Sequence, residues 1–382
     1  MAKLPTPCVL VEQERLDRNL REMQRHADQQ RATLRPHIKT HKCLKIARLQ
    51  LDIGAAGVTS AKPEEATVFV ADGVPSLTLA YPVVDAVRLA PLLRLAATHG
   101  TSVRAIVDSR EGVSALARAA RDAEAALDVL VKIDVGLGRV GVDPAADEAV
   151  EIPRLVLGTG RLRLAGLLAH AGHAYAAGSR DGVRQVAVDE RHCLARLVRR
   201  LAANGIVVEE VSIGCTPTAL LSCAMPPIEG VQVIEMRPGN YAFLDLTAVR
   251  LGLVDLDRLA LGVLVTVVSS RGDRAIIDAG SKTLSSDLGP HGTGGNEGYG
   301  LAISPERFLS RDSGESFAFP VERLSEEHGL LRTEGHKLPI GTRLMVLPNH
   351  ACVVANLARE YVVVREGQPV AKWPVHARAM VH

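Results

Sequence analysis

Between about residues 33 and 240, short runs of β-branched and apolar residues alternate with longer stretches whose apolar positions recur with helical period. This alternation is typical of repeated strand–helix units. Eight such units can be counted, and they predict an α/β fold of the (β/α)8 TIM-barrel type. The predicted strands are residues 34–38, 56–59, 77–81, 103–107, 129–134, 164–170, 207–213 and 231–237.

After about residue 251 the pattern changes to alternating strands separated by turn residues, with almost no helical period: LGVLVTVVSS, RAIIDAG, GTRLMVLP and REYVVVRE. This part predicts a second, mostly β domain. The early strand-like segment TPCVLVE, followed by a helix at 13–29, is expected to pair with it. We therefore expect a barrel over 12–250 and a β domain formed by 251–382 together with 1–11.

Composition narrows the classes of function. The 382 residues carry a formal charge of only +2 and are 3% aromatic, which gives little support to nucleic-acid binding. No apolar run approaches the roughly 20 residues of a membrane span, and the start MAKLPTPC lacks the apolar core of a signal peptide, so we expect a cytoplasmic protein without membrane association. The six cysteines are scattered without a CxxC pair, which argues against a disulfide framework.

Chemistry in a TIM barrel gathers at the C-terminal ends of the strands. The turns after the seventh and eighth predicted strands read GCTPT and RPGN. Turns at these two places commonly hold a phosphate group through backbone N–H groups that glycine leaves accessible. Glycine and proline also make ordinary tight turns. The coincidence of both motifs at these two turns favours a phosphate site.

Lys39 lies at the mouth of the first predicted strand, in RPHIKTHK. A partly desolvated lysine there can form an imine with a cofactor aldehyde. If strand alternation persists through this segment, His37 and Lys39 point the same way and Ile38 the opposite way. Lys42 and Lys45 are better explained as solvated lysines at the start of the next helix.

The segment PNHAC in the β domain offers a second cluster. On an extended strand, His350 and Cys352 would face the same side and could bind one divalent ion. Thiolate and imidazole ligands favour Zn²⁺, with Mn²⁺ and Mg²⁺ as alternatives. An isolated HxC pattern also occurs as a buried cysteine beside a packed histidine, and spacing alone does not decide between them.

With these residues in place, the chain resembles the fold-type III pyridoxal 5'-phosphate (PLP) enzymes, and among them the D-threonine aldolase and D-serine dehydratase family. The resemblance runs nearly end to end. It implies a PLP-holding TIM barrel joined to a β domain, in a homodimer with the site near the subunit interface. The motifs that carry it are TPCVLVEQERLDRNL, LRPHIKTHK, DVGLGRVGV, HAGHAY, VSIGCTPT, EMRPGNYAFLD, DAGSKTLSSD and PNHACVVANL.

The resemblance also implies roles for individual residues. Lys39 matches the Schiff-base lysine, and Tyr175 matches the dehydratase tyrosine near the pyridine nitrogen. His350 and Cys352 match the dehydratase metal ligands. Cys215 stands where dehydratases tend to have serine, which puts one hydroxyl bond to phosphate in doubt. The phosphate-binding turns are matched by Gly214, Cys215, Thr216, Gly239 and Asn240, and Arg139 and His170, after strands five and six, complete the expected cofactor contacts.

HAGHAY, GCTPT and HxC resemble the dehydratase branch, whereas related aldolases more often show HCD. We therefore expect a PLP- and metal-dependent lyase that converts a D-3-hydroxy amino acid, such as D-serine or D-threo-3-hydroxyaspartate, to a 2-oxo acid and ammonia. The alternatives are retro-aldol cleavage to glycine and an aldehyde, and a non-catalytic PLP carrier. A glycine-rich segment at 287–300 is expected to be functional, and Arg139 or His291 could bind a second substrate carboxylate.

Overall fold

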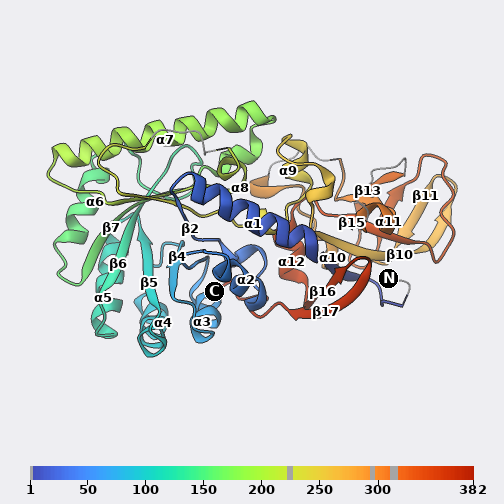
Figure 1. Cartoon of the computed structure of the whole chain (residues 1–382), viewed down its shortest axis with the longest axis horizontal. Coiled ribbons are helices and arrows are strands. Elements are labelled where there is room, and N and C mark those ends of the chain that lie inside the picture. The colour runs from blue at the N-terminus through green and yellow to red at the C-terminus, as the bar shows by residue number, and fades with distance from the viewer. Residues whose placement is uncertain (1–2, 222–226, 293–296, 310–316) are drawn as a thin grey trace.

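A computed structural model describes residues 3–221, 227–292, 297–309 and 317–382. The chain forms a strand–helix barrel and, beside it, a part rich in long antiparallel strands (Figure 1). The helix α1 (Gln13–Gln29) runs along the boundary between the two parts. In the described residues, no helix has the length and apolar character needed to cross a membrane.

The barrel is one parallel sheet of eight strands in the order β2-β9-β8-β7-β6-β5-β4-β3. Its two ends meet through an isolated parallel bridge between His37 and Thr59, where the Thr59 N–H donates to the Pro36 carbonyl at 2.7 Å. All eight predicted strands are therefore present. Their bounds are β2 (Thr33–Leu34), β3 (Val58–Ser60), β4 (Ser76–Leu79), β5 (Ser102–Val107), β6 (Leu127–Ile133), β7 (Leu162–Ala169), β8 (Glu210–Ile213) and β9 (Val233–Met236).

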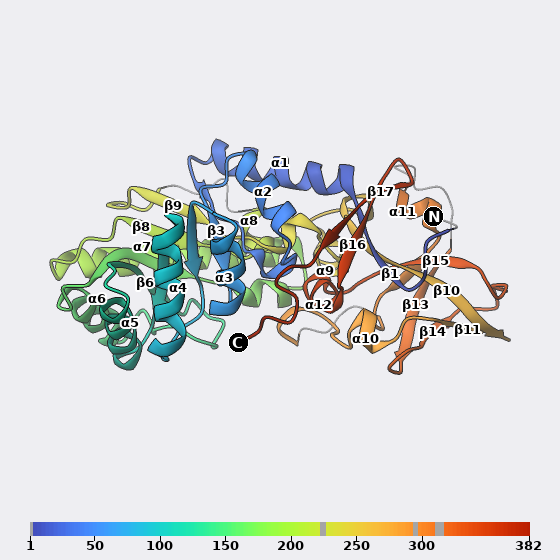
Figure 2. The ribbon, with the colours of Figure 1, turned by 90° about the horizontal axis from the view of Figure 1, so that it is seen from below.

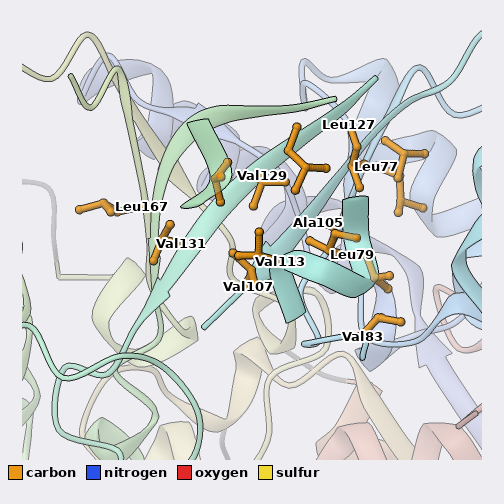
Figure 3. Packing of buried hydrophobic residues seen from close by; sticks show 14 of the residues in the cluster. Leu77, Leu79, Val83, Ala105, Val107, Val113, Leu127, Val129, Val131 and Leu167 are labelled. Atoms are coloured by element: carbon orange, nitrogen blue, oxygen red, sulfur yellow. The ribbon is translucent and has the colours of Figure 1, made fainter. Parts of the chain in front are cut away.

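Strand side chains alternate between two environments. Val129 and Val131 pack outward with helix residues such as Val113 (Figure 3), whereas Leu130 faces inward with Ile106. This two-residue period places an apolar layer between the sheet and its helices. The helices are α2 (Leu44–Asp52), α3 (Pro63–Ala71), α4 (Ala86–His99), α5 (Arg110–Asp122), α6 (Glu148–Leu157), α7 (Arg180–Ala203), α8 (Thr216–Ala219) and α9 (Leu246–Arg250).

The barrel interior contains a buried ion network centred on Glu235, whose side chain is 1% exposed. One carboxylate oxygen accepts from Nε of Arg35 at 2.6 Å, and the other accepts from Nη2 of Arg104 at 3.0 Å and from Oγ of Ser212 at 2.7 Å. A buried carboxylate is tolerated when its charge is paired and its lone pairs are hydrogen-bonded. This network joins four parts of the sequence inside the barrel. They are β5, β8, β9 and Arg35, which directly follows β2.

The second part is a nine-stranded sheet in the order β11-β14-β13-β12-β15-β10-β1-β16-β17. The N-terminal strand β1 lies between β10 and β16 (Figure 2), and it pairs antiparallel with β10 and parallel with β16. Its strands are β1 (Cys8–Glu12), β10 (Leu261–Arg271), β11 (Arg274–Ile277), β12 (Leu301–Ile303), β13 (Ala318–Leu324), β14 (Gly329–Arg332), β15 (Arg343–Leu347), β16 (Glu360–Arg365) and β17 (Gln368–Pro374), with helices α10 (Ser281–Leu284), α11 (Pro305–Leu309) and α12 (Ala351–Leu357).

Two local predictions were wrong. Residues after Leu34 do not continue as a regular strand, because Nδ1 of His37 accepts the Lys39 N–H and starts the 3₁₀ helix η1 (Ile38–Thr40). The HxC segment is not a strand either, because only His350 is extended and α12 begins at Ala351. Pro348 ends the strand pairing, and the Asp245 carboxylate accepts the Ala351 N–H at 3.0 Å at the start of α12.

Candidate active site

A cavity of about 340 Å³ lies at the C-terminal ends of the barrel strands, and residues of the β domain form part of its wall. Its volume falls within the range of small-molecule and cofactor sites. Nine of the eleven predicted site residues line it, and Arg139 and Gly214 do not. The nine are Lys39, His170, Tyr175, Cys215, Thr216, Gly239, Asn240, His350 and Cys352.

Lys39 lies in η1, directly after the bridge that closes the barrel. Withdrawal from water lowers the pKa of Lys39 below its usual value, and the charge of Arg139 acts in the same direction, while Cys352 opposes the shift. A lysine amine with a lowered pKa loses its proton more readily and is a better nucleophile and base. Although the predicted strand alternation is wrong, His37 and Lys39 both line the cavity.

The turn after β9 passes very close to η1. A Cβ at Gly239 would lie 2.8 Å from the His37 carbonyl oxygen and 2.9 Å from Oγ1 of Thr40. Because real Cβ atoms do not approach backbone oxygens this closely, only glycine fits here. Next to it, Oδ1 of Asn240 is buried with no hydrogen-bond partner among the described residues, while its Nδ2 donates to Asp245 at 2.7 Å.

The turn after β8 is closed by its own side chains. The Cys215 N–H donates to Oγ1 of Thr218 at 3.2 Å, and the Cys215 thiol donates to the Ala171 carbonyl at 3.3 Å. Burial raises the pKa of Cys215 to about 11, so its thiol is protonated at neutral pH. Thr216 receives the Tyr241 N–H at 3.1 Å and links this turn to the one after β9.

Three rings gather over these turns. His291 lies with its ring centroid 5.7 Å from that of His170 and 5.6 Å from that of Tyr175. Burial lowers the pKa of His170 well below its usual value, and burial with the charges of Arg139 and Lys39 lowers that of His291 to about 4. Nε2 of His170 has no partner among the described residues. These imidazoles are therefore neutral at neutral pH, and His170 presents an unpaired nitrogen.

His350 and Cys352 meet on the β-domain side of the cavity, where their side chains are hydrogen-bonded to each other. Burial opposes charge on His350, but the Cys352 thiolate and Asp287 outweigh it and raise the pKa of His350 to about 10. Burial likewise opposes the Cys352 thiolate, but His350, Thr40 and Lys39 lower the pKa of Cys352 overall. Sγ of Cys352 lies 3.2 Å from Oγ1 of Thr40, beside Lys39.

The carboxylate of Asp287 accepts a hydrogen bond from Nδ1 of His350 at 2.7 Å, and its other oxygen accepts the Gly289 N–H at 3.0 Å. The predicted functional segment 287–300 thus contributes Asp287 and His291 to the site, while its residues 293–296 lie outside the described part. In the residues that the structure describes, no three His, Cys, Asp or Glu side chains converge in a metal-binding arrangement.

Arg139 lies outside the cavity wall, but its charge lowers the pKa of Lys39, His170 and His291. The loop that carries it is wrapped around Asp134, whose carboxylate accepts N–H groups from residues 136, 137 and 138. Direct contact of Arg139 with a cofactor stays a prediction. Gly214 is also outside the wall, with φ +98° in the left-handed region, and its carbonyl faces Nδ1 of His170 at 3.4 Å.

Sequence reasoning missed Arg237, Lys62 and the role of Asp287. Arg237 lines the cavity, donates from Nε to Oγ of Ser212 at 2.5 Å, and donates from Nη2 to the Ala169 carbonyl. Arg237 is the first residue of RPGN, one of the two predicted phosphate turns, and this position was the signal that the sequence offered. Asp287 ends the motif DAGSKTLSSD and begins the predicted functional segment 287–300, but its contact with His350, 63 positions away, could not be inferred from the sequence.

Comparison with known proteins places this site in a family. The family model described as alanine racemase, N-terminal domain, matches residues 11–246, and the one described as putative serine dehydratase domain matches residues 260–364. A D-threo-3-hydroxyaspartate dehydratase of Delftia sp. is 32% identical, with 97% of this chain and 97% of that protein covered. A D-threonine aldolase of Arthrobacter sp. is also 32% identical, with 99% and 94% covered.

Solved structures agree. The structure of the Delftia dehydratase superposes with a TM-score of 0.87 over 98% of both chains. The structure of a D-threonine aldolase from Filomicrobium marinum, which is 29% identical, superposes with a TM-score of 0.85 and covers 100% of this chain and 97% of that one. An alanine racemase of Clostridium difficile, 14% identical with a TM-score of 0.66, shares the fold. The chain therefore belongs to the fold-type III PLP enzymes, and within them to the family of D-threonine aldolases and D-serine dehydratases.

Proposed function

We propose that the protein is a PLP- and divalent-metal-dependent dehydratase that converts a D-3-hydroxy amino acid to a 2-oxo acid and ammonia. The observation that carries the proposal is the convergence of Lys39 with the hydrogen-bonded pair His350 and Cys352 on one cavity. The pair would bind a metal ion in the same cavity as a lysine that is suited to covalent attachment of the cofactor.

The residues around the cavity fit PLP. The turn at Gly239 carries no side chain that would hinder a phosphate from reaching backbone N–H donors. Among the described residues, Oδ1 of Asn240 and Nε2 of His170 are buried without a hydrogen-bond partner. Thr216 and the backbone around Cys215 are the remaining phosphate candidates. Tyr175, which is 9% exposed, and His170 would flank the ring, and Lys39 would hold the cofactor covalently.

When bound, PLP supplies an electron sink that stabilises negative charge at the substrate Cα. Lys39 would have two roles. Its Nζ would hold the cofactor covalently, and its amine, when free, would be the base that removes the proton from the substrate Cα. The lowered pKa of Lys39, caused by burial, suits the second role because a neutral amine is required as the base.

His350 and Cys352 fit a soft divalent ion, for which Zn²⁺ is our first choice and Mn²⁺ or Mg²⁺ are alternatives. With Nδ1 of His350 committed to Asp287, Nε2 remains for the ion. When bound, the ion supplies a Lewis acid for the departing 3-hydroxyl group. One solved D-threo-3-hydroxyaspartate dehydratase structure is described as a cysteine-to-alanine variant in the metal-free form, which supports a cysteine ligand in this family.

Retro-aldol cleavage is the second candidate, because a D-threonine aldolase is as similar in sequence as the dehydratase. The thiol ligand at position 352 favours dehydration, since aldolases of this family more often carry an aspartate there. We also propose that the protein is cytoplasmic and, from the family resemblance, that it is a homodimer. The barrel at 12–250 would hold PLP, and residues 251–382 with 1–11 would form the domain carrying the metal.

Borohydride reduction followed by peptide mapping tests the cofactor assignment. The purified protein should be yellow, and reduction should remove the absorbance and leave a pyridoxyl adduct on Lys39. Chelation should abolish ammonia release from D-3-hydroxy amino acids while the cofactor absorbance persists, and Zn²⁺ should restore it. An adduct on another lysine, or full activity in metal-free protein, would contradict the proposal.

A further inference from the structure

The cavity wall is strongly basic. Among the described residues that line it there are lysines, an arginine and four histidines, but no aspartate or glutamate. A basic wall of this kind favours the binding of an anionic ligand. Because buried or half-buried charges are costly without partners, the partner of each cation indicates which one is available to a ligand.

Two of the cations are already paired within the protein. Nζ of Lys42 lies 3.0 Å from the Glu65 carboxylate and donates to the Met380 carbonyl at 3.2 Å. Arg237 is held by Ser212 and by a backbone carbonyl, and it faces the negative charges of Glu235 and Glu190. Lys39 is reserved for the cofactor. None of these three is free to recognise a substrate side chain.

The histidines are not suitable cations either. His37, His170 and His291 all have pKa values lowered by burial, that of His291 to about 4, so they are neutral at neutral pH. His350 is engaged with Asp287 and Cys352. The expectation that His291 or Arg139 binds a second carboxylate therefore loses its support, since His291 is uncharged and Arg139 does not line the cavity.

Lys62 is different. It lines the cavity from the end of β3, and no described carboxylate forms an ion pair with it. Its Nζ lies 3.8 Å from the centroid of the Tyr81 ring, a cation–π contact that holds the ammonium without neutralising it. Lys62 lines the cavity and is itself partly exposed, and Tyr81 is 43% exposed, so this ammonium lies where the cavity opens to solvent.

We propose that Lys62 binds the second carboxylate of the substrate, and that the preferred substrates are D-3-hydroxy dicarboxylic amino acids of the 3-hydroxyaspartate type rather than D-serine. The inference rests on the proposed function. The substrate Cα must approach Lys39 inside the cavity, so a carboxylate one carbon further out reaches toward the mouth. A lysine ammonium there offers three donors for charge-assisted hydrogen bonds.

The test uses two ligands that lack a leaving hydroxyl. D-Aspartate carries the second carboxylate and D-alanine does not, and binding of each to the PLP-loaded protein is followed by the change in cofactor absorbance. Wild-type protein should bind D-aspartate about 10- to 100-fold more tightly than D-alanine. Lys62→Met should abolish this preference, Lys62→Arg should retain most of it, and the exposed-lysine control Lys45→Met should leave it unchanged.

The outcomes separate this inference from the proposed function. A wild-type protein without preference for D-aspartate, or a Lys62→Met variant that keeps the preference, overturns the assignment. An equal loss of affinity for both ligands in Lys62→Met also overturns it, because Lys62 would then serve the carboxylate that both share. If the preference behaves as expected but no ammonia is formed from D-threo-3-hydroxyaspartate, the carboxylate site stands and the dehydratase proposal fails.

Discussion

Asp287 and His350 lie 63 positions apart in the chain, yet the carboxylate of Asp287 receives the Nδ1 proton of His350 at 2.7 Å. Since a carboxylate only accepts, Nδ1 of the histidine carries the shared proton. Nε2 is then the nitrogen that a metal ion would bind, by displacing the second proton that the raised pKa of His350 leaves on the ring. Asp287 is itself held by the Gly289 N–H. The pair has the arrangement in which a carboxylate orients a metal-ligating histidine.

We expect Asp287→Asn to bind Zn²⁺ about 10- to 100-fold more weakly than wild type, because the amide orients the imidazole less firmly. Competition with a chromophoric chelator measures this directly, and cofactor absorbance reports that the PLP site is intact. Asp273→Asn, which removes an exposed carboxylate from the same domain, should bind the metal as wild type does. Equal affinity in Asp287→Asn and wild type would show that the contact does not support metal binding.

Gly239→Ala should weaken PLP binding by about tenfold or more, since the new methyl group would meet the His37 carbonyl oxygen at 2.8 Å and push the turn away from η1. Equilibrium dialysis of the cofactor provides the measurement. Gly158→Ala is the matched control, because its Cβ would make only ordinary contacts, the nearest at 3.5 Å. Unchanged PLP affinity in Gly239→Ala would argue against this turn as a phosphate site.

Glu235→Gln should lower the free energy of unfolding by about 3 kcal/mol or more, because it leaves Arg35 charged and buried without its carboxylate partner and leaves Arg104 with Glu210 alone. Urea denaturation gives the value. Glu151→Gln, which breaks an exposed pair with Arg110, should change the stability by less than about 0.5 kcal/mol. Similar small effects for both substitutions would mean that the buried network contributes little to stability.

Stability should decrease as the pH falls from about 7 to 5. Burial lowers the pKa of His41 to about 3, from 6.5 in an unfolded chain, so between these values the unfolded chain binds a proton that the folded one does not. This favours unfolding by about 2 kcal/mol at pH 5. His41→Asn should lose less stability over this range than wild type, whereas replacing the exposed His99 should not alter the loss. An identical pH dependence in His41→Asn would contradict the assignment.

Much of the fold could be predicted because its signals are local. The apolar runs of the barrel strands and the helix at 13–29 follow from periodicity within a few residues, and all eight strands were found. Two short segments are exceptions, and neither contact shows in the periodicity of apolar residues. His37 caps a 3₁₀ turn in place of a strand by accepting the N–H of Lys39, two residues further on. Asp245, which lies 106 positions away, accepts the Ala351 N–H where a helix starts.

The site residues also fall into those that the sequence predicted and those that it did not. Lys39, Gly239 and the pair His350 and Cys352 stand in short motifs, so sequence alone brought them forward, and the structure places them on one cavity. Lys62 stands in no such motif, and Asp287 stands in one, DAGSKTLSSD, that does not reveal its partner. The importance of both depends on which distant side chains they meet and on which charges remain unpaired.

The products that the PLP- and Zn²⁺-loaded protein forms from D-threo-3-hydroxyaspartate distinguish a dehydratase from an aldolase. We predict equimolar ammonia and oxaloacetate, and loss of both in Cys352→Ala with the cofactor still bound at Lys39. Glycine and glyoxylate in place of ammonia and oxaloacetate, or undiminished ammonia release by Cys352→Ala, would contradict the account.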